Sequence, residues 1–209
     1  MLELLTGTGL ASAAGLNAYI PLLAVGLIAR YTDLLTLGPG WQWMEHPASL
    51  GVLGVLLVLE LVADKIPVVD SVNDIVQTFV RPTSGGLTFG AGAAAVDSAD
   101  LTAASTGDGS WWPIAGGVVI ALVFHTLKSL ARPLLNTLTL GAGGPVISAI
   151  EDIGSAVMSL LAIIVPILVL VVLPLTVAGA VVLWRRRRRG RADGTRAGTV
   201  PDTPADGER

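Results

Sequence analysis

Long apolar stretches separated by short polar segments make up most of the chain. Leu4–Ala29 runs for 26 residues without a charge, and a helix rising about 1.5 Å per residue needs only about 20 residues to cross a bilayer core. Further apolar stretches follow at Ala48–Ile66, Pro113–Leu130, Val146–Val165 and Ile167–Trp184. This pattern predicts an all-α, polytopic helical membrane protein with about five to six membrane segments.

Prolines mark where several of these segments end. Pro67 is expected to stop or kink the second stretch, because proline lacks an N–H donor and clashes with the preceding helical turn. Pro166 interrupts an apolar run of 39 residues, which is too long for one helix across a bilayer and favours a helical hairpin over one long kinked helix. Leu4–Ala29 is predicted to be one membrane helix, although Asn17 and Pro21 interrupt its middle.

The segment after Pro67 has an amphipathic pattern. Within Val68–Val80, four polar residues recur at spacings of three and four and therefore share one helical face: Asp70, Asn73, Asp74 and Gln77. Such a helix lies at the membrane interface or packs as a re-entrant piece. Residues 83–96 are rich in Gly and Ala and short for a span, which leaves open either a short re-entrant or broken helix or a membrane crossing.

Charge is distributed unevenly along the chain. Residues 185–209 hold 8 basic and 4 acidic residues and carry a net +4, whereas residues 1–184, with 5 basic and 12 acidic residues, carry −7. We therefore expect 1–184 to form a helical membrane domain and 185–209 a basic, disordered cytoplasmic tail. Alternating the predicted segments back from Arg185–Arg189 places both termini in the cytoplasm, and 31–47 and 97–112 outside. The arginine run is also expected to attract anionic lipid.

The composition argues against several classes of function. The sequence has no Cys and two His, His46 and His125, so disulfides, a thiolate nucleophile and a multi-His metal site are not expected. It contains no HExxH, GxSxG or phosphate-loop motif, and we expect no enzyme activity, cofactor or metal. The basic residues gather in a tail rather than on the face of a folded domain, which argues against nucleic acid as a partner.

Polar clusters lie near the ends of the apolar helices. Glu60 and Asp64 are four residues apart, and His125, Lys128 and Arg132 recur at spacings of three and four, so each group shares a helical face. Ionisable residues at membrane depth cost about 2.5–3.5 kcal/mol each unless they are paired or hydrated. We therefore expect the carboxylates to meet the cations, with Asp64 bound to Lys128 or Arg132.

A third cluster joins Asn136 to Glu151 and Asp152, and Glu151 competes with Asp64 for the same cations. Because all these groups fall at helix ends, they are expected to form one charged site between helices. The complete candidate polar site consists of Asn17, Tyr19, Glu60, Asp64, Lys65, Asp70, Asn73, Asp74, Arg81, His125, Lys128, Arg132, Asn136, Glu151 and Asp152.

Two functions remain open for such a site. A small transporter or channel-like protein would use Glu60 or His125 to relay protons, or Lys128 and Arg132 to hold an anionic group. A non-catalytic membrane protein that binds lipid or a partner would use the same residues as helix-packing glue. Because 209 residues is small for a monomeric transporter, a homo-oligomer or an internal pseudo-symmetry is also expected.

Two stretches of the chain have distinctive motifs. The first is Gly15–Leu23, which reads Gly-Leu-Asn-Ala-Tyr-Ile-Pro-Leu-Leu, and the second is Val62–Asp74, which is followed by Phe79–Pro82. Both resemble the DUF4126 family of uncharacterised bacterial integral membrane proteins, over roughly residues 7–165. The resemblance implies a multi-pass protein of the bacterial inner membrane and supplies no activity.

Overall fold

A computed structural model describes residues 2–96, 111–138, 144–179 and 181–182. Of these, 67–72, 74, 96, 131–138 and 144 are described by their backbone alone. The predicted disordered tail and the Arg185–Arg189 run lie outside the described residues, as does nearly all of the predicted outside loop 97–112.

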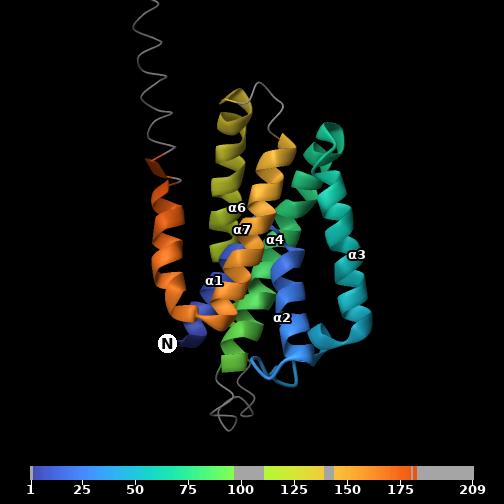
Figure 1. The fold of residues 1–209 in the computed structure, drawn as a ribbon, viewed down its shortest axis with the longest axis vertical. Helices are drawn as coiled ribbons and strands as arrows, with labels where there is room; N and C mark the ends of the chain where they lie inside the picture. The colour runs from blue at the N-terminus through green and yellow to red at the C-terminus, as the bar shows by residue number, and fades with distance from the viewer. Residues whose placement is uncertain (1, 97–110, 139–143, 180, 183–209) are drawn as a thin grey trace, which may run out of the picture.

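The regular secondary structure of the described residues is entirely helical, which confirms the predicted all-α class. The α-helices are α1 (Leu2–Leu16), α2 (Tyr19–Tyr31), α3 (Pro47–Ala63), α4 (Pro67–Val96), α6 (Trp112–Leu138) and α7 (Gly144–Ile164) (Figure 1). Two 3-10 turns are η1 (Gln42–Glu45) and η3 (Pro166–Leu168), and η3 begins an apolar helix that continues to Gly179. Within α6 and α7, the stretches Trp112–Leu130 and Pro145–Ile164 are long and apolar enough to cross a membrane.

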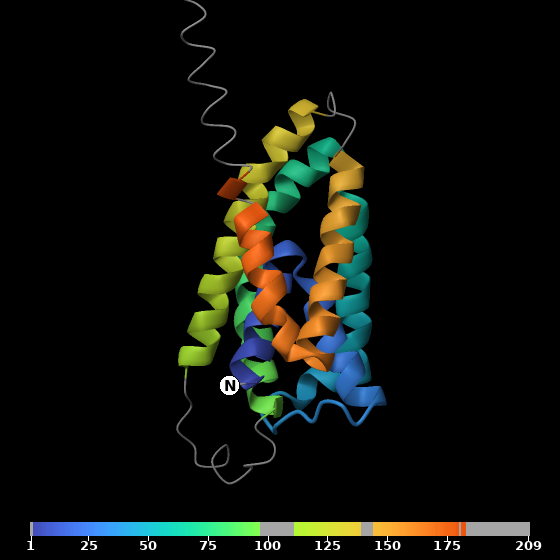
Figure 2. The same cartoon turned by 60° about the vertical axis from the view of Figure 1, so that its left-hand side comes forward.

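The first apolar stretch forms two short helices that fold back on each other. In Figures 1 and 2, α1 rises from the N-terminus to about half the height of the bundle, and α2 returns from there to the end that carries residues 32–46. The prediction of a single helix over Leu4–Ala29 is therefore wrong. The α1–α2 pair is a helical hairpin whose tip, Asn17–Ala18, is buried inside the bundle.

Local chemistry explains where this helix breaks. Pro21 has no N–H to donate to the carbonyl of Asn17, and its ring disfavours a continuous helix through that carbonyl. The Asn17 Oδ1 atom instead accepts hydrogen bonds from the backbone N–H groups of Tyr19 (3.0 Å) and Ile20 (3.1 Å). These are two of the donors that the first turn of any helix leaves free, so Asn17 ends one helix and stabilises the start of the next.

Small residues allow α1 to occupy the centre of the bundle. It packs against α4, α6 and α7, and nine of its fifteen residues are buried, most of them Gly, Ala and Ser. A Cβ atom at Gly15 would meet the backbone oxygen of Ala121 in α6. Likewise, a Cβ at Gly117 would meet the backbone of Gly85 where α6 crosses α4. Without these glycines the helices could not approach so closely.

The remaining helices correct two further predictions. α4 continues through Pro82 as one 30-residue helix, so 83–96 is not a separate re-entrant or broken helix. α6 likewise continues through Pro133 to Leu138, beyond the end of the predicted apolar stretch Pro113–Leu130. Pro67 does begin a new helix after α3, and the chain does reverse at Pro166, so that the last helix runs back alongside the bundle, as predicted (Figure 1).

The ends of the described chain lie at opposite ends of the bundle. The N-terminus is at the end that carries 32–46, whereas residues 181–182 lie toward the end that carries 64–66 (Figure 1). The prediction that both termini are cytoplasmic assumed that Leu4–Ala29 crosses a membrane once, whereas α1 and α2 run in opposite directions. The location of the termini relative to a membrane stays a prediction.

Candidate functional site

Polar side chains from α4, α6 and α7 form hydrogen bonds with the α1–α2 hairpin near its tip. Lys128 Nζ of α6 donates to the carbonyl oxygen of Leu16 at 3.1 Å. Ser84 of α4 donates to the carbonyl of Ala18, and Ser155 of α7 donates to that of Ala13 at 2.9 Å. The Ala13 carbonyl also accepts a hydrogen bond from the backbone N–H of Asn17 (3.0 Å). The Leu16 carbonyl loses its usual helical donor, because the N–H of Ile20 binds Asn17 Oδ1 instead, and a buried polar group without a partner is costly.

Asn17 links the tip to α7. Its Nδ2 atom donates to Asp152 Oδ1 at 2.9 Å while its Oδ1 atom stabilises the start of α2. Asn17 is 1 % exposed. The other Asp152 carboxylate oxygen, Oδ2, is buried and has no hydrogen-bond partner among the described residues.

Lys128 forms an ion pair as well as its bond to the hairpin. Its Nζ atom lies 2.8 Å from Glu151 Oε2, and the lysine is buried. The carboxylate predicted as the competing partner is thus the one that Lys128 contacts. A cation at the C-terminal end of α1 also interacts favourably with the helix dipole.

Asp64, at the end of α3, connects three helices. Its Oδ1 atom accepts a hydrogen bond from Asn73 Nδ2 of α4 at 2.9 Å, and its Oδ2 atom accepts one from Ser148 Oγ of α7 at 2.8 Å. Asp64 is buried. Neither of these neutral donors was predicted from the sequence as a partner of Asp64.

A second ion pair lies on the α3–α4 side of the tip. Arg81 Nη2 of α4 is 3.2 Å from Glu60 Oε1 of α3, and both side chains are about 1 % exposed. Arg81 Nη1 lies 3.4 Å from His125 Nδ1, and His125 Nε2 lies 3.3 Å from Thr78 Oγ1. These contacts form a buried polar chain from α3 through α4 to α6.

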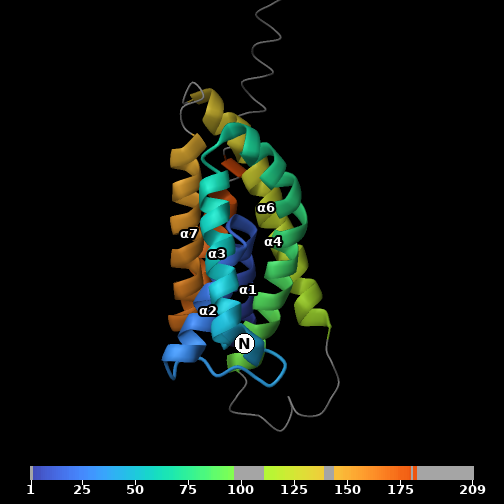
Figure 3. The same ribbon diagram turned by 90° about the vertical axis from the view of Figure 1, so that its right-hand side faces the viewer.

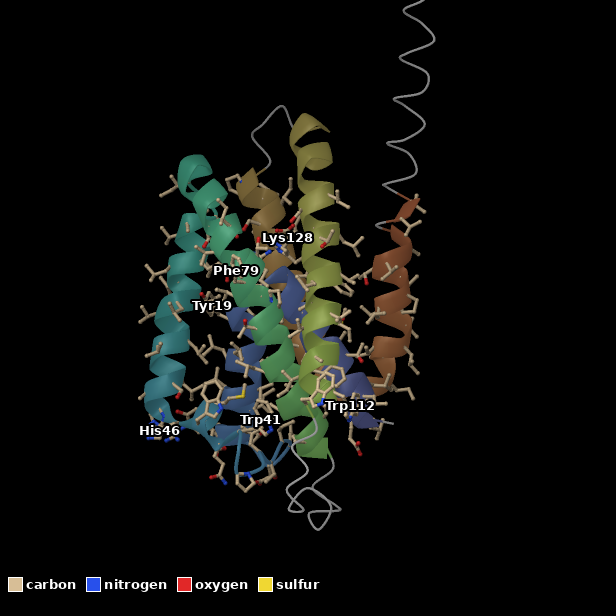
Figure 4. The ribbon with its side chains drawn as sticks, turned by 180° about the vertical axis from the view of Figure 1, so that it is seen from behind. Tyr19, Trp41, His46, Phe79, Trp112 and Lys128 are labelled. Carbon is tan, nitrogen blue, oxygen red and sulfur yellow. The ribbon has the colours of Figure 1, made fainter. Side chains whose placement is uncertain are left out.

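A pocket of about 370 Å³ opens beside this chain, between α2, α3 and α4. Tyr19, Glu60, Asn73 and Gln77 supply its polar lining. Its apolar lining consists of Leu56, Leu59, Val62, Ala63 and Ile66. Figure 4 shows Tyr19 and Lys128 at a similar height in the bundle, well away from the end where Trp41 and Trp112 lie.

Two oxygen atoms of the pocket residues are left without partners. Glu60 Oε2 and Gln77 Oε1 are buried and have no hydrogen-bond partner within the described part of the chain. The Gln77 side chain is hydrogen-bonded to the Tyr19 hydroxyl. The polar end of the pocket therefore offers unused hydrogen-bond acceptors, one of them on a carboxylate whose other oxygen already binds Arg81.

The structure brings most of the predicted site residues together around the hairpin tip. These are Asn17, Tyr19, Glu60, Asp64, Asn73, Arg81, His125, Lys128, Glu151 and Asp152. Lys65 is not among them, because it is exposed and donates to the carbonyl of Leu61 at 3.0 Å. The side chains of Asp70, Asp74, Arg132 and Asn136 lie outside the described residues.

Sequence reasoning missed the hydroxyl groups of the site. Thr78, Ser84, Ser148 and Ser155 each contact one of the charged groups or the broken backbone. In the sequence they look like small residues tolerated in apolar helices. The sequence offers one sign of their role, which is helical spacing. Ser148, Glu151 and Ser155 are three and four residues apart and therefore share one face of α7.

Comparison with known proteins places the chain in a family without assigning an activity. A family model described as "Domain of unknown function (DUF4126)" matches residues 4–186, which is most of the chain. No curated protein and no solved structure matches it.

Proposed function

Because the chain belongs to the DUF4126 family, whose description gives no activity, we propose a function from the site itself. The protein is an integral membrane protein that transports a cation through the site at the tip of the α1–α2 hairpin. Glu60 is the group that binds the cation, and Arg81 holds Glu60 in place. The protein acts without catalysing a reaction.

The surface of the bundle supports a membrane location. α7 exposes Val146, Ile150, Ile153, Val157 and Leu160 along one face, and α3 exposes a similar row of valines and leucines. The interior, by contrast, holds charged residues and small residues. A soluble protein rarely exposes apolar patches of this extent, whereas lipid tails would cover them.

Aromatic residues and charges suggest the orientation. Trp41, Trp43 and Trp112 lie at the end of the bundle that carries residues 32–46. Tryptophans are enriched at the lipid headgroup interface of membrane proteins, so this end is expected to lie at a membrane surface. The helix that leads to Arg185–Arg189 ends toward the 64–66 end, so the positive-inside rule places that end in the cytoplasm. The N-terminus is then on the outer side.

Cysteine labelling tests this topology directly, because the natural chain contains no Cys. A Thr36→Cys variant should react with a membrane-impermeant thiol reagent in intact cells. A Lys65→Cys variant should react only after the membrane is permeabilised. The reverse pattern would place the arginine run outside, and labelling of both in intact cells would contradict a membrane-embedded bundle.

The observation that carries the transport proposal is the broken helix beside an open pocket. In membrane transporters, discontinuous helices place free backbone groups near the bilayer midplane, where substrates bind. Here the break lies about half-way along the bundle (Figure 3). Glu60 and Tyr19, which begins α2, both line the pocket next to it.

The charge balance of the site favours a cation over an anion. The described buried carboxylates of the site are Glu60, Asp64 and Asp152, with Glu151 nearly buried, whereas the described buried cations are Arg81 and Lys128. The Glu60 oxygen with no partner is also an acceptor rather than a donor. An anion in the pocket would lie beside the Glu60 carboxylate, which would repel it.

The second candidate function is a lipid- or partner-binding protein in which the polar groups only pack helices together. The contacts of Lys128 and Asp64 favour it, because both residues bind groups of the protein itself. The two functions differ in what happens when the Glu60–Arg81 pair is replaced by neutral residues of similar shape.

A double-mutant experiment separates them. Glu60→Gln alone leaves Arg81 buried beside a neutral amide, which should lower stability. Adding Arg81→Gln removes both charges and should restore stability in either case. Proteoliposomes with a trapped pH-sensitive dye and an imposed membrane potential then report proton and cation flux. We expect flux from the wild-type protein and none from the stable double variant; a double variant as active as wild type would establish the packing role instead.

A further inference from the structure

The geometry points to the class of cation: an organic amine with an apolar body, whose ammonium group binds between Glu60 and Gln77 while its body fills the apolar part of the pocket. This inference rests on the proposed function and names the substrate of the same site.

The polar end of the pocket has the donor and acceptor pattern that an ammonium group requires. Glu60 is 3 % exposed and Gln77 1 % exposed, and each has a buried oxygen without a partner in the described chain. A protonated amine has N–H donors and no acceptor, so it can satisfy both oxygens at once. The bond to the carboxylate is charge-assisted and therefore the stronger of the two.

The lining of the pocket does not suit a metal ion. Hard cations such as Ca²⁺ take about six to eight oxygen ligands, whereas five of the nine lining residues here are apolar. No group of three or more metal-ligating side chains occurs among the described residues. A volume of about 370 Å³ instead accommodates a small organic molecule with an aliphatic or aromatic body.

The way into the pocket is also apolar. Leu59, Val62 and Ile66 line it and are 59 %, 53 % and 47 % exposed, on the outer side of α3 and the turn into α4. In the proposed membrane setting Leu59 and Val62 face lipid, whereas Ile66 lies next to Lys65 at the cytoplasmic end. A lipophilic amine that partitions into the bilayer can therefore reach Glu60 from the side, whereas a hydrated ion cannot.

Binding of 4-phenylbutylamine, measured by calorimetry with the protein in phosphatidylcholine nanodiscs, tests this inference. We expect saturable binding that weakens about tenfold or more in Glu60→Gln and in Gln77→Leu, since each loses a buried acceptor. Asp33→Asn makes the same carboxylate-to-amide change at an exposed position at the 32–46 end and should bind as wild type does. The neutral analogue 4-phenylbutanol should bind far more weakly, because it lacks the charge.

A second set of nanodiscs tests whether the ammonium group belongs to a free amine or to a lipid headgroup. Phosphatidylethanolamine also has a primary ammonium group, so nanodiscs that contain it would show weakened 4-phenylbutylamine binding if the headgroup occupied the pocket. Unchanged affinity assigns the pocket to free amines. Equal binding of the amine to wild type, Glu60→Gln and Gln77→Leu would overturn the inference, as would tight binding of the alcohol.

The two proposals fail in different ways. Amine binding that depends on Glu60, without any flux in proteoliposomes, would refute transport and leave the amine pocket standing. Cation flux that depends on Glu60, without amine binding, would refute the amine pocket and leave transport standing. If Glu60→Gln proves too unstable to purify, the charge-neutral Glu60→Gln/Arg81→Gln variant and Gln77→Leu give the same readout.

Discussion

Around the tip of the α1–α2 hairpin, α6 and α7 present polar side chains on one side, and α3 and α4 present them on the other. On the α6–α7 side, Lys128, Asp152 and Ser155 bind the hairpin itself, through the Leu16 carbonyl, the Asn17 side chain and the Ala13 carbonyl. On the α3–α4 side, Ser84 also donates to the Ala18 carbonyl, but Glu60 and Gln77 do not bind the hairpin backbone and instead border the pocket.

The difference shows that similar residue types serve different purposes according to what they face. A charged group that binds broken backbone stabilises the fold, because its removal leaves free carbonyls and an unpaired partner in the interior. A carboxylate with one oxygen in a salt bridge and the other unpartnered beside a pocket retains capacity for a ligand. Substitutions on the two sides should therefore divide between effects on stability and effects on binding.

The largest effect on stability is expected at Lys128. Lys128→Met removes the bond to the Leu16 carbonyl and leaves Glu151 without this cation. Loss of one partner of a buried pair costs about 3–5 kcal/mol, so the melting temperature in detergent should fall sharply. Lys65→Met is the matched control, because Lys65 is exposed. Equal melting temperatures for the two variants would show that the α6–α7 side does not anchor the hairpin.

An intermediate effect is expected where the two sides meet. α4 belongs to the pocket side and α6 to the anchoring side, and they are in closest contact at Gly85 and Gly117. A Cβ in Gly117→Ala would press on the Gly85 backbone, and such overpacking costs about 1–3 kcal/mol. A Cβ in Gly116→Ala meets nothing within 4 Å and should be neutral or slightly stabilising in an unfolding titration. A destabilised Gly116→Ala protein would contradict this packing.

A smaller loss is expected at Asn17, which belongs to the anchoring side. Asn17→Ala removes the acceptor for two backbone N–H groups of α2 and the donor to Asp152. Loss of a helix-capping side chain costs about 1–2 kcal/mol. Asn17→Asp keeps the acceptor and adds a negative charge beside Asp152, so it should be at least as damaging. A fully stable Asn17→Asp variant would show that the bond to Asp152 is unimportant.

The sequence predicted the helical class and most helix positions, because apolar runs and prolines act locally. It failed at the hairpin, although Asn17 and Pro21 were visible in the middle of the run. An apolar stretch long enough to cross a bilayer favours one helix, and several groups that stabilise the break, among them Lys128 and Ser84, are distant in the sequence. Pro82 is an exception in the other direction, because α4 continues through it as one helix, and the small residues that follow pack against α1 and α6.

The charged members of the site were predictable because buried ionisable residues are rare and conspicuous in apolar helices. The partners of these charged residues were harder to predict. Asp64 binds Asn73 and Ser148, which were not predicted as its partners, and Glu60 binds Arg81, which was in the candidate set without a partner. Which pairs form depends on helix rotation and depth, and the hairpin changes both.

The smallest stability effect is expected at Tyr19, on the pocket side of the tip and two residues from Asn17. Tyr19→Phe removes a hydroxyl that is hydrogen-bonded to Gln77 and lines the pocket, but it leaves the ring and the backbone of α2 unchanged. Because Tyr19 is only partly buried, water can satisfy Gln77, and the loss of stability should stay below about 1 kcal/mol. Binding of 4-phenylbutylamine should change more than stability does, because Gln77 is then free to reorient its amide. If Tyr19→Phe melted as low as Asn17→Ala and bound the amine like wild type, the two sides of the tip would share one structural role, and the division between anchor and pocket would be wrong.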